Sequence, residues 1–304
     1  MIQASSSAYE RLRAAAAQLH VPDAVRTAAA AAPGDPRPGQ IWRAVWDGVV
    51  EVVAIAAVDD TTVHALPVSL ETRFNDPDTV LLPAEASTLE QPLALWCGLG
   101  RRLPWYVLDR QVSELSVPLE ADGSPAPDAS GYRYGSPLPS PASQAAEFRS
   151  TLADTMDVLA TARWAPSGSG GLPALLKQCG LGPTELIHRL SIRPPRALAL
   201  LRAQTPLTPP EAHLLAPTLG MSADAILAAN PPLPDRLVHE LSRPARRQQI
   251  RRLAHLTGTA EQEARRQALF ATLTLAARQE RPAEVDWPAR VDRYFHVHLG
   301  PESE

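Results

Sequence analysis

Residues 172–230 break into five short helical segments that are separated by proline, glycine and small polar residues. Gly182-Pro183-Thr184-Glu185 begins the second segment, because proline is tolerated in a first helical turn, where its missing amide has no partner to lose. Thr208-Pro209-Pro210-Glu211 has the pattern of a capping box and begins the fourth segment, which Gly220 ends. Leucines at helical spacing give the segments apolar faces. The pattern predicts a compact all-α domain.

The run GPTELIHRLSIRPPRALALLRAQTPLTPPEAHLLAPTLGMSADAILAA resembles the lambda-repressor-like, or Xre-type, helix-turn-helix regulators over residues 170–232. In that family the third helix enters the major groove of DNA and its first turn reads base edges. The resemblance implies DNA contacts from Arg193 and Arg196, because arginine can make paired bonds to guanine. Thr184, at the start of the second helix, and Arg202, at the end of the third, are the other DNA-binding residues expected in this domain.

Other residues of the predicted third helix fit this role less well. Pro194, Pro195 and Ala199 offer no hydrogen-bond donors to bases, and Leu198 and Leu201 stand where the family usually has polar residues. An alternative is therefore that this helix docks on protein. The two hypotheses differ in whether arginines or leucines dominate its outer surface.

A cluster of arginines follows the predicted helix-turn-helix domain. Between residues 236 and 252 there are six arginines and one acidic residue, Glu240. Phosphate contacts need only cations within reach, so this region is expected to bind the DNA backbone. The alternative is a solvated arginine face on a helix. The residues expected to bind DNA here are Arg243, Arg246, Arg247 and Arg251.

The charge of the chain is unevenly distributed. Residues 1–147 contain 10 basic and 18 acidic side chains, a net charge of −8, whereas residues 148–304 contain 19 and 15, a net charge of +4. The two parts add up to the −4 of the whole chain. A basic C-terminal half suits a polyanionic partner, and an acidic N-terminal half does not.

The region from residue 40 to 108 has the periodicity of short strands. Two apolar runs, 41–46 and 49–55, flank Asp47-Gly48, which is a strong hairpin signal. Further strands are expected at Thr62–Pro67, Thr79–Leu82 and Trp105–Leu108. Five short strands within about 75 residues are typical of a small barrel.

Residues 38–115 show a weaker resemblance to the MazF/PemK-type toxins, whose fold is an SH3-like barrel. The matching pieces are the Pro-Gly-Gln-Ile-Trp opening and Leu66-Pro67-Val68-Ser69. The resemblance places Ser69 at a catalytic position, but the first loop is reduced to Asp47-Gly48 and supplies no arginine. Arg43 or Arg73 could replace it only in an unusual geometry. Without a cation on the developing phosphorane charge, we expect no enzymatic activity.

The predicted fold is therefore multidomain, with a small all-β SH3-like barrel, an all-α helix-turn-helix domain and a C-terminal helical region. The predicted parts are an N-terminal helical segment (1–35), the barrel (36–118), a Pro/Ser/Gly-rich linker (119–145), the helix-turn-helix domain (146–232) and a basic helical region (233–304), which also looks suited to packing or dimerisation.

The sequence favours a bacterial, cytoplasmic DNA-binding transcriptional regulator that binds double-stranded DNA as a homodimer, with a barrel that binds a signal or a protein partner. The sequence contains no apolar run of eighteen residues, so no membrane span is predicted. Cys97 and Cys179 lie too far apart for a metal or redox motif, so no metal or other cofactor is expected. One alternative is an antitoxin-like or scaffold protein with a repurposed helix-turn-helix. Another is a toxin-like ribonuclease fused to its neutralising domain.

Overall fold

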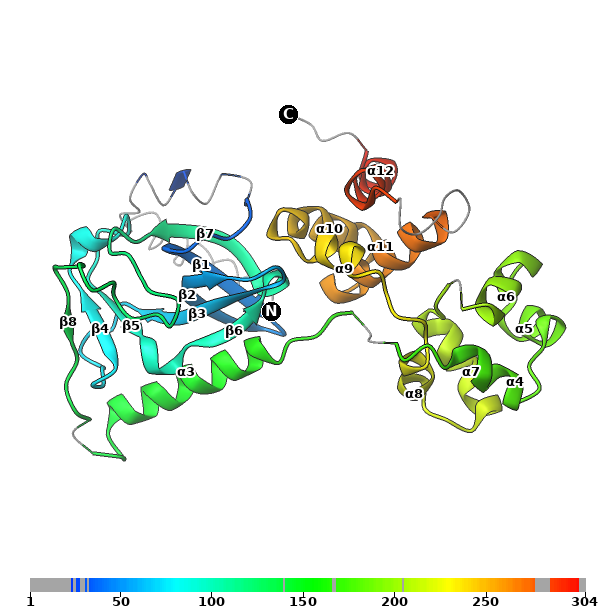
Figure 1. Ribbon diagram of the computed structural model, residues 1–304, viewed down its shortest axis with the longest axis horizontal. Coiled ribbons are helices and arrows are strands. Elements are labelled where there is room, and N and C mark those ends of the chain that lie inside the picture. Colours follow the sequence, from blue (N-terminus) through cyan, green and yellow to red (C-terminus); the bar gives the residue numbers. More distant parts are fainter. Residues whose placement is uncertain are drawn as a thin grey trace, which may run out of the picture. The chain divides into compact units, whose positions relative to one another are not determined.

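The structure is a computed structural model that describes residues 33–300 apart from 139, 166–167, 204 and 277–284, together with a few positions between 23 and 31. The chain divides into two compact units, residues 1–162 and 163–304. The first contains an antiparallel sheet and one long helix, and the second consists of helices (Figure 1). The N-terminal helical segment predicted over 1–35 lies almost wholly outside the described residues.

The sheet begins with the hairpin that the sequence predicts. Strands β1 (Gln40–Trp46) and β2 (Val49–Val58) pair antiparallel, with Trp46 opposite Val49. Asp47 and Gly48 form the two-residue turn with φ of 48° and 80°. Positive φ at both central positions is what a type I′ turn requires, and this turn matches the twist of the two strands.

The later strands agree with the predictions only in part. Strand β3 (Thr62–Ser69) and strand β4 (Thr79–Leu82) lie where they were expected. Trp105–Val107, predicted as strand, is instead a short 3₁₀ helix that separates two strands. Trp105 is buried there and its indole Nε1 donates to Thr62 O at 3.1 Å, so the indole is anchored outside the ladder. The other strands are β5 (Leu93–Trp96), β6 (Arg101–Pro104), β7 (Leu108–Glu114) and β8 (Arg133–Tyr134).

The sheet has the strand order β7-β1-β2-β3-β5-β4-β8, with β6 also paired to β3. No ladder between described residues joins β7 to β8, so the sheet is not closed as the predicted barrel would be. A single bridge between Ser87 and Leu115 connects the segment after β4 to the end of β7. One face of the sheet holds an apolar core that includes Ile41, Val80 and Leu93.

Helix α3 (Gln144–Ala160) covers another part of the sheet and belongs to the first unit. Met156 and Leu159 join the buried cluster that contains Trp42 and Ile55. Ion pairs at both ends fix the helix: Arg149 Nε is 2.8 Å from Asp76 Oδ2, and Arg101 Nε is 2.7 Å from Asp157 Oδ1. The sequence predicts residues 146–162 as part of the helix-turn-helix domain, whereas the apolar face of this segment packs on the sheet.

The segment predicted as a linker, 119–145, is largely part of the same unit. Strand β8 within it pairs with β4, and Cys97 Sγ donates to Gly123 O at 3.3 Å. Gly123 is buried with a φ of +92°, and a Cβ atom there would lie 2.6 Å from Leu66 Cδ2. Gly123 therefore permits close packing of this segment against Leu66 of the sheet.

The second unit begins with five short helices around one apolar core. They are α4 (Leu172–Gln178), α5 (Pro183–Leu190), α6 (Pro194–Leu201), α7 (Pro209–Leu219) and α8 (Ala223–Ala228). Both ends of this array lie together, because Gly170 N donates to Asn230 O and Ser169 N donates to Ala228 O, each at 2.8 Å. We call residues 168–230 the five-helix module.

The chain then forms helices α9 (Asp235–Ser242), α10 (Pro244–Thr257), α11 (Glu261–Ala276) and α12 (Trp287–Leu299). These four helices contact one another, and we call them the C-terminal bundle. Trp164, which precedes the five-helix module, is buried against the bundle: its Nε1 donates to Ser242 Oγ at 3.1 Å, and Arg266 Nε donates to Trp164 O at 3.0 Å. The five-helix module is therefore inserted between two parts of one packed structure.

Candidate nucleic-acid interface

Helices α5 and α6 are joined by only three residues, Ser191–Arg193. Ser191 ends α5 in the left-handed conformation, with φ of 52°, which turns the chain sharply. Leu186 and Leu190 of α5 pack with Ala197 and Leu200 of α6 in the module's core. This packing leaves the opposite side of α6 toward solvent.

The exposed side of α6 carries few polar groups. Pro194, Pro195 and Leu198 are exposed, and Leu198 keeps 40% of its surface accessible. Arg193 precedes the helix and Arg202 follows it, and both are exposed. Their side chains form no hydrogen bond or ion pair with any other described residue. No acidic residue occurs between 193 and 202. The face is apolar in the middle and cationic at its two ends.

Arg196, expected to read bases, is held inside the module. Its Nε and Nη2 donate to the two carboxylate oxygens of Glu211 at 2.7 Å each, and Nη2 also donates to Pro206 O at 3.2 Å. Glu211 also accepts from Thr208 N as part of the capping box of α7. Burial by itself would raise the pKa of Glu211, but the hydrogen bonds from Arg196 and Thr208 outweigh it and lower the pKa. The pair is therefore ionised at neutral pH.

This contact predicts that Arg196→Ala destabilises the module instead of changing which bases are recognised. We expect a loss of about 1–3 kcal/mol, because a buried carboxylate would lose its charged donor. Arg193→Ala, the same change at an exposed position, should alter the free energy of unfolding by less than about 0.5 kcal/mol. Urea unfolding followed by circular dichroism measures both. Equal stability of the two variants would contradict the structural role of Arg196.

Thr184 is exposed on α5, one residue after Pro183 begins that helix. Arg189 lies further along the same helix, where its Nη1 donates to Thr218 Oγ1 at 2.8 Å. Of the four residues of the module expected to bind DNA, three are therefore exposed: Thr184, Arg193 and Arg202.

The arginines of the C-terminal region are mostly engaged in ion pairs within the bundle. Arg246 pairs with Glu240 of α9 and Asp292 of α12, and its side chain is only 12% exposed. Arg243 pairs with the same Glu240 at 3.4 Å. Glu240 is itself buried, so both pairs contribute to helix packing. This arrangement differs from the phosphate-binding surface and from the solvated arginine face that the sequence suggested.

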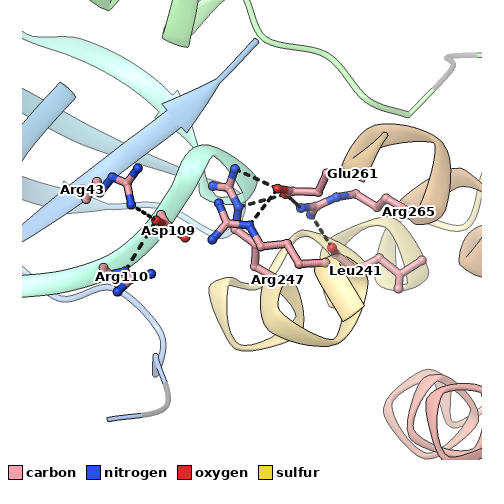
Figure 2. Close-up of polar contacts among 8 residues, drawn as sticks. Arg43, Asp109, Arg110, Leu241, Arg247, Glu261 and Arg265 are labelled. Atoms are coloured by element: carbon pink, nitrogen blue, oxygen red, sulfur yellow. Dashed lines mark hydrogen bonds and ion pairs between the residues drawn. The ribbon is translucent and has the colours of Figure 1, made fainter. Parts of the chain in front are cut away.

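A second carboxylate, Glu261 at the start of α11, binds three arginines (Figure 2). Arg247 Nε is 2.8 Å from Glu261 Oε1, Arg265 Nη2 is 3.0 Å from the same oxygen, and Arg251 Nε is 3.1 Å from Oε2. The side chains of Arg247 and Arg265 are 4% and 1% exposed. Arg265 Nη1 also donates to Leu241 O at 2.6 Å, which connects α11 to α9. We call the side chains of Glu261, Arg247, Arg251 and Arg265 the Glu261 cluster.

The toxin resemblance singles out Ser69, Arg43 and Arg73, and no hydrogen bond or ion pair between described residues joins Ser69 to either arginine. Ser69 Oγ is buried and has no hydrogen-bond partner among the described residues. Arg43 Nη1 instead donates to Asp109 Oδ2 at 3.0 Å, and this carboxylate also pairs with Arg110 (Figure 2). Arg73 pairs with Glu71 and lies over the ring of Phe74.

Burial raises the pKa of the Cys97 thiol to about 11, which makes it a weak nucleophile at neutral pH.

The described residues contain no group of three or more histidine, cysteine, aspartate or glutamate side chains placed to hold a metal ion. Within the same residues, none of the helices combines the length and the hydropathy needed to cross a bilayer.

Comparison of the chain with protein-family models, with curated proteins and with solved structures finds no match. The distinctive part of the candidate interface is the exposed face of α6.

Proposed function

We propose that α5 and α6 act as a helix-turn-helix and that the protein is a transcriptional regulator that binds duplex DNA through α6. The observation that carries this proposal is the exposed side of α6, which ends in two arginines and contains no acidic group. A cation within reach of a phosphate releases counterions from DNA, and this supplies much of the affinity of such proteins. The three-residue connection between α5 and α6 also fits the short turn of the motif.

The set of DNA-binding residues in this proposal is smaller than the sequence suggested. Arg193, Arg202 and Thr184 are accessible on the module, whereas Arg196, Arg246 and Arg247 contribute to packing through ion pairs. A buried arginine would have to leave its carboxylate to reach a phosphate, which leaves a buried charge behind. We therefore assign the first contacts with DNA to the five-helix module.

We propose that the first unit, residues 1–162, which we call the sheet unit, binds a signal or a protein partner. Acidic residues outnumber basic residues in its first 147 positions, so it is a poor surface for DNA. Its strand order is compatible with an opened SH3-like barrel in which the Ser87–Leu115 bridge takes the place of a closing ladder. A cavity of about 350 Å³ in this unit is lined by side chains that include Leu81, Tyr132 and Arg133.

The proposed function predicts that Arg193→Ala together with Arg202→Ala weakens binding of the full chain to a labelled 20-base-pair duplex. The slope of log affinity against log salt should decrease by about 0.9 for each phosphate contact that is lost. Fluorescence anisotropy over a series of salt concentrations gives both quantities. Arg102→Ala is the matched control, because this arginine is 73% exposed on β6 of the other unit.

The intact protein should bind duplex DNA at low salt, and the control variant should bind as the intact protein does. If the protein binds no duplex, or if the double variant binds with unchanged affinity and salt slope, the proposal is overturned. Leu198 supports a second function, because a 40% exposed leucine on this helix also suits a protein partner. A protein complex that Leu198→Glu abolishes in a folded chain, while DNA binding is unchanged, would establish that function.

A further inference from the structure

The exposed side of α6 has a chemical pattern that limits how it can distinguish DNA sequences. Pro194, Leu198 and Arg202 follow one another at intervals of four residues, so they lie on one face of the helix. Pro195 is exposed beside them. The middle of this face is therefore a patch of two prolines and one leucine, which we call the α6 apolar patch.

Hydrogen-bond donors are scarce on this face. Pro194 and Pro195 occupy the first two positions of α6, and proline has no backbone N–H. The N-terminus of the helix therefore lacks two of the amides that usually bind anions. Arg196, at the third position, is committed to Glu211. Recognition of guanine by paired hydrogen bonds therefore has little support on this helix.

The dimensions of the helix fit the major groove. With 8 residues, α6 is about 12 Å long. The major groove of B-DNA is also about 12 Å wide. Arg193 and Arg202, one at each end of the helix, are thus spaced to meet phosphates on the two sides of the groove, and the α6 apolar patch would face the base edges between them.

On the basis of the proposed function, we infer that the α6 apolar patch recognises the 5-methyl groups of thymine. These methyl groups project into the major groove and are the apolar feature that distinguishes A·T pairs there. Burying one methyl group in an apolar contact contributes about 0.8 kcal/mol, equivalent to about a fourfold difference in affinity. Sequence preference therefore comes from apolar contact, and affinity comes from the arginines.

The experiment compares three duplexes of one sequence with the full-length protein. The first contains thymine, the second has every thymine replaced by deoxyuridine, and the third combines deoxyuridine with 5-methylcytosine in place of cytosine. We expect the thymine duplex to bind at least about fourfold more tightly than the deoxyuridine duplex. The third duplex should recover part of the lost affinity, because the methyl group of 5-methylcytosine also projects into the major groove.

Leu198→Ala removes the centre of the patch and should reduce the preference for thymine to less than about twofold. Leu214→Ala is the control, because this leucine is 57% exposed on α7 and lies outside the patch. Circular dichroism verifies that both variants are folded. The thymine preference should survive in the control.

Equal affinity for the thymine and deoxyuridine duplexes would overturn this inference and leave the proposed function intact. A thymine preference that persists in folded Leu198→Ala would also overturn it. Absence of binding to all three duplexes at low salt would contradict the proposed function itself. A loss of self-association in Leu198→Ala, with DNA affinity and thymine preference unchanged, would assign the patch to a protein interface instead.

Discussion

Replacing Glu261 by glutamine should destabilise the C-terminal bundle by about 3–5 kcal/mol. The substitution removes the negative charge that Arg247 and Arg265 share, and both guanidinium groups are buried. Removing one partner of a buried ion pair costs this much because the remaining charge has lost its compensation. Hydrogen exchange of peptides from α10 and α11 measures the effect locally, and exchange should accelerate roughly a hundredfold or more.

Glu263→Gln provides the matched control on the same helix. Glu263 is 36% exposed, and its carboxylate lies 3.6 Å from Arg266. Exposed pairs of this kind contribute at most about 1 kcal/mol. If Glu261→Gln changed exchange no more than Glu263→Gln does, the Glu261 cluster would have no structural importance.

The second large effect concerns Glu51, which lies on the same side of β2 as Val53 and Ile55. Burial raises the pKa of Glu51 to about 7 from an ordinary value near 4.5, and a hydrogen bond from Val52 N offsets only part of this increase. A carboxyl with a raised pKa favours the folded state while it is protonated. Its contribution is therefore complete below about pH 4.5 and is lost as the pH rises through 7.

Glu51→Gln should consequently stabilise the sheet unit at pH 8 and have little effect at pH 4. The upper limit of the gain is about 3 kcal/mol, since each pKa unit corresponds to about 1.4 kcal/mol, and partial exposure of the carboxyl reduces it. Urea unfolding of the intact protein and the variant at several pH values gives the difference. Glu114→Gln, on an exposed residue of β7, is the control. If Glu51→Gln changed the free energy of unfolding by the same amount at pH 4 and pH 8, the raised pKa of Glu51 would be contradicted.

Local patterns in the sequence predicted much of the secondary structure. The Asp47-Gly48 turn and the capping box of α7 depend on residues only a few positions apart, and both are present. Trp105–Val107 was misassigned because its residues favour strands by composition, although the indole hydrogen bond to Thr62 holds them in a 3₁₀ turn. The two residues of this contact are 43 positions apart in the sequence, so no local pattern could predict it.

The candidate site was less predictable for the same reason. The sequence identified α6 and its arginines, but it could not indicate that Arg196 would bind Glu211, 15 residues away on another helix. The sequence also concentrates six arginines between residues 236 and 252, which favours a cationic surface. The carboxylates that neutralise this region belong to α9, α11 and α12, so a face that looked free along the chain is paired in three dimensions.

The insertion of the five-helix module affects how the chain can fold. Trp164 and Ser242, which hydrogen-bond to each other, are 78 residues apart, and closing a long loop has an entropic cost that grows with its length. The module has its own apolar core, and its ends are joined by backbone hydrogen bonds from Ser169 and Gly170. Once it has formed, the effective loop between Trp164 and Ser242 shortens to about 16 residues. We therefore expect formation of the module to bring Trp164 close to the C-terminal bundle.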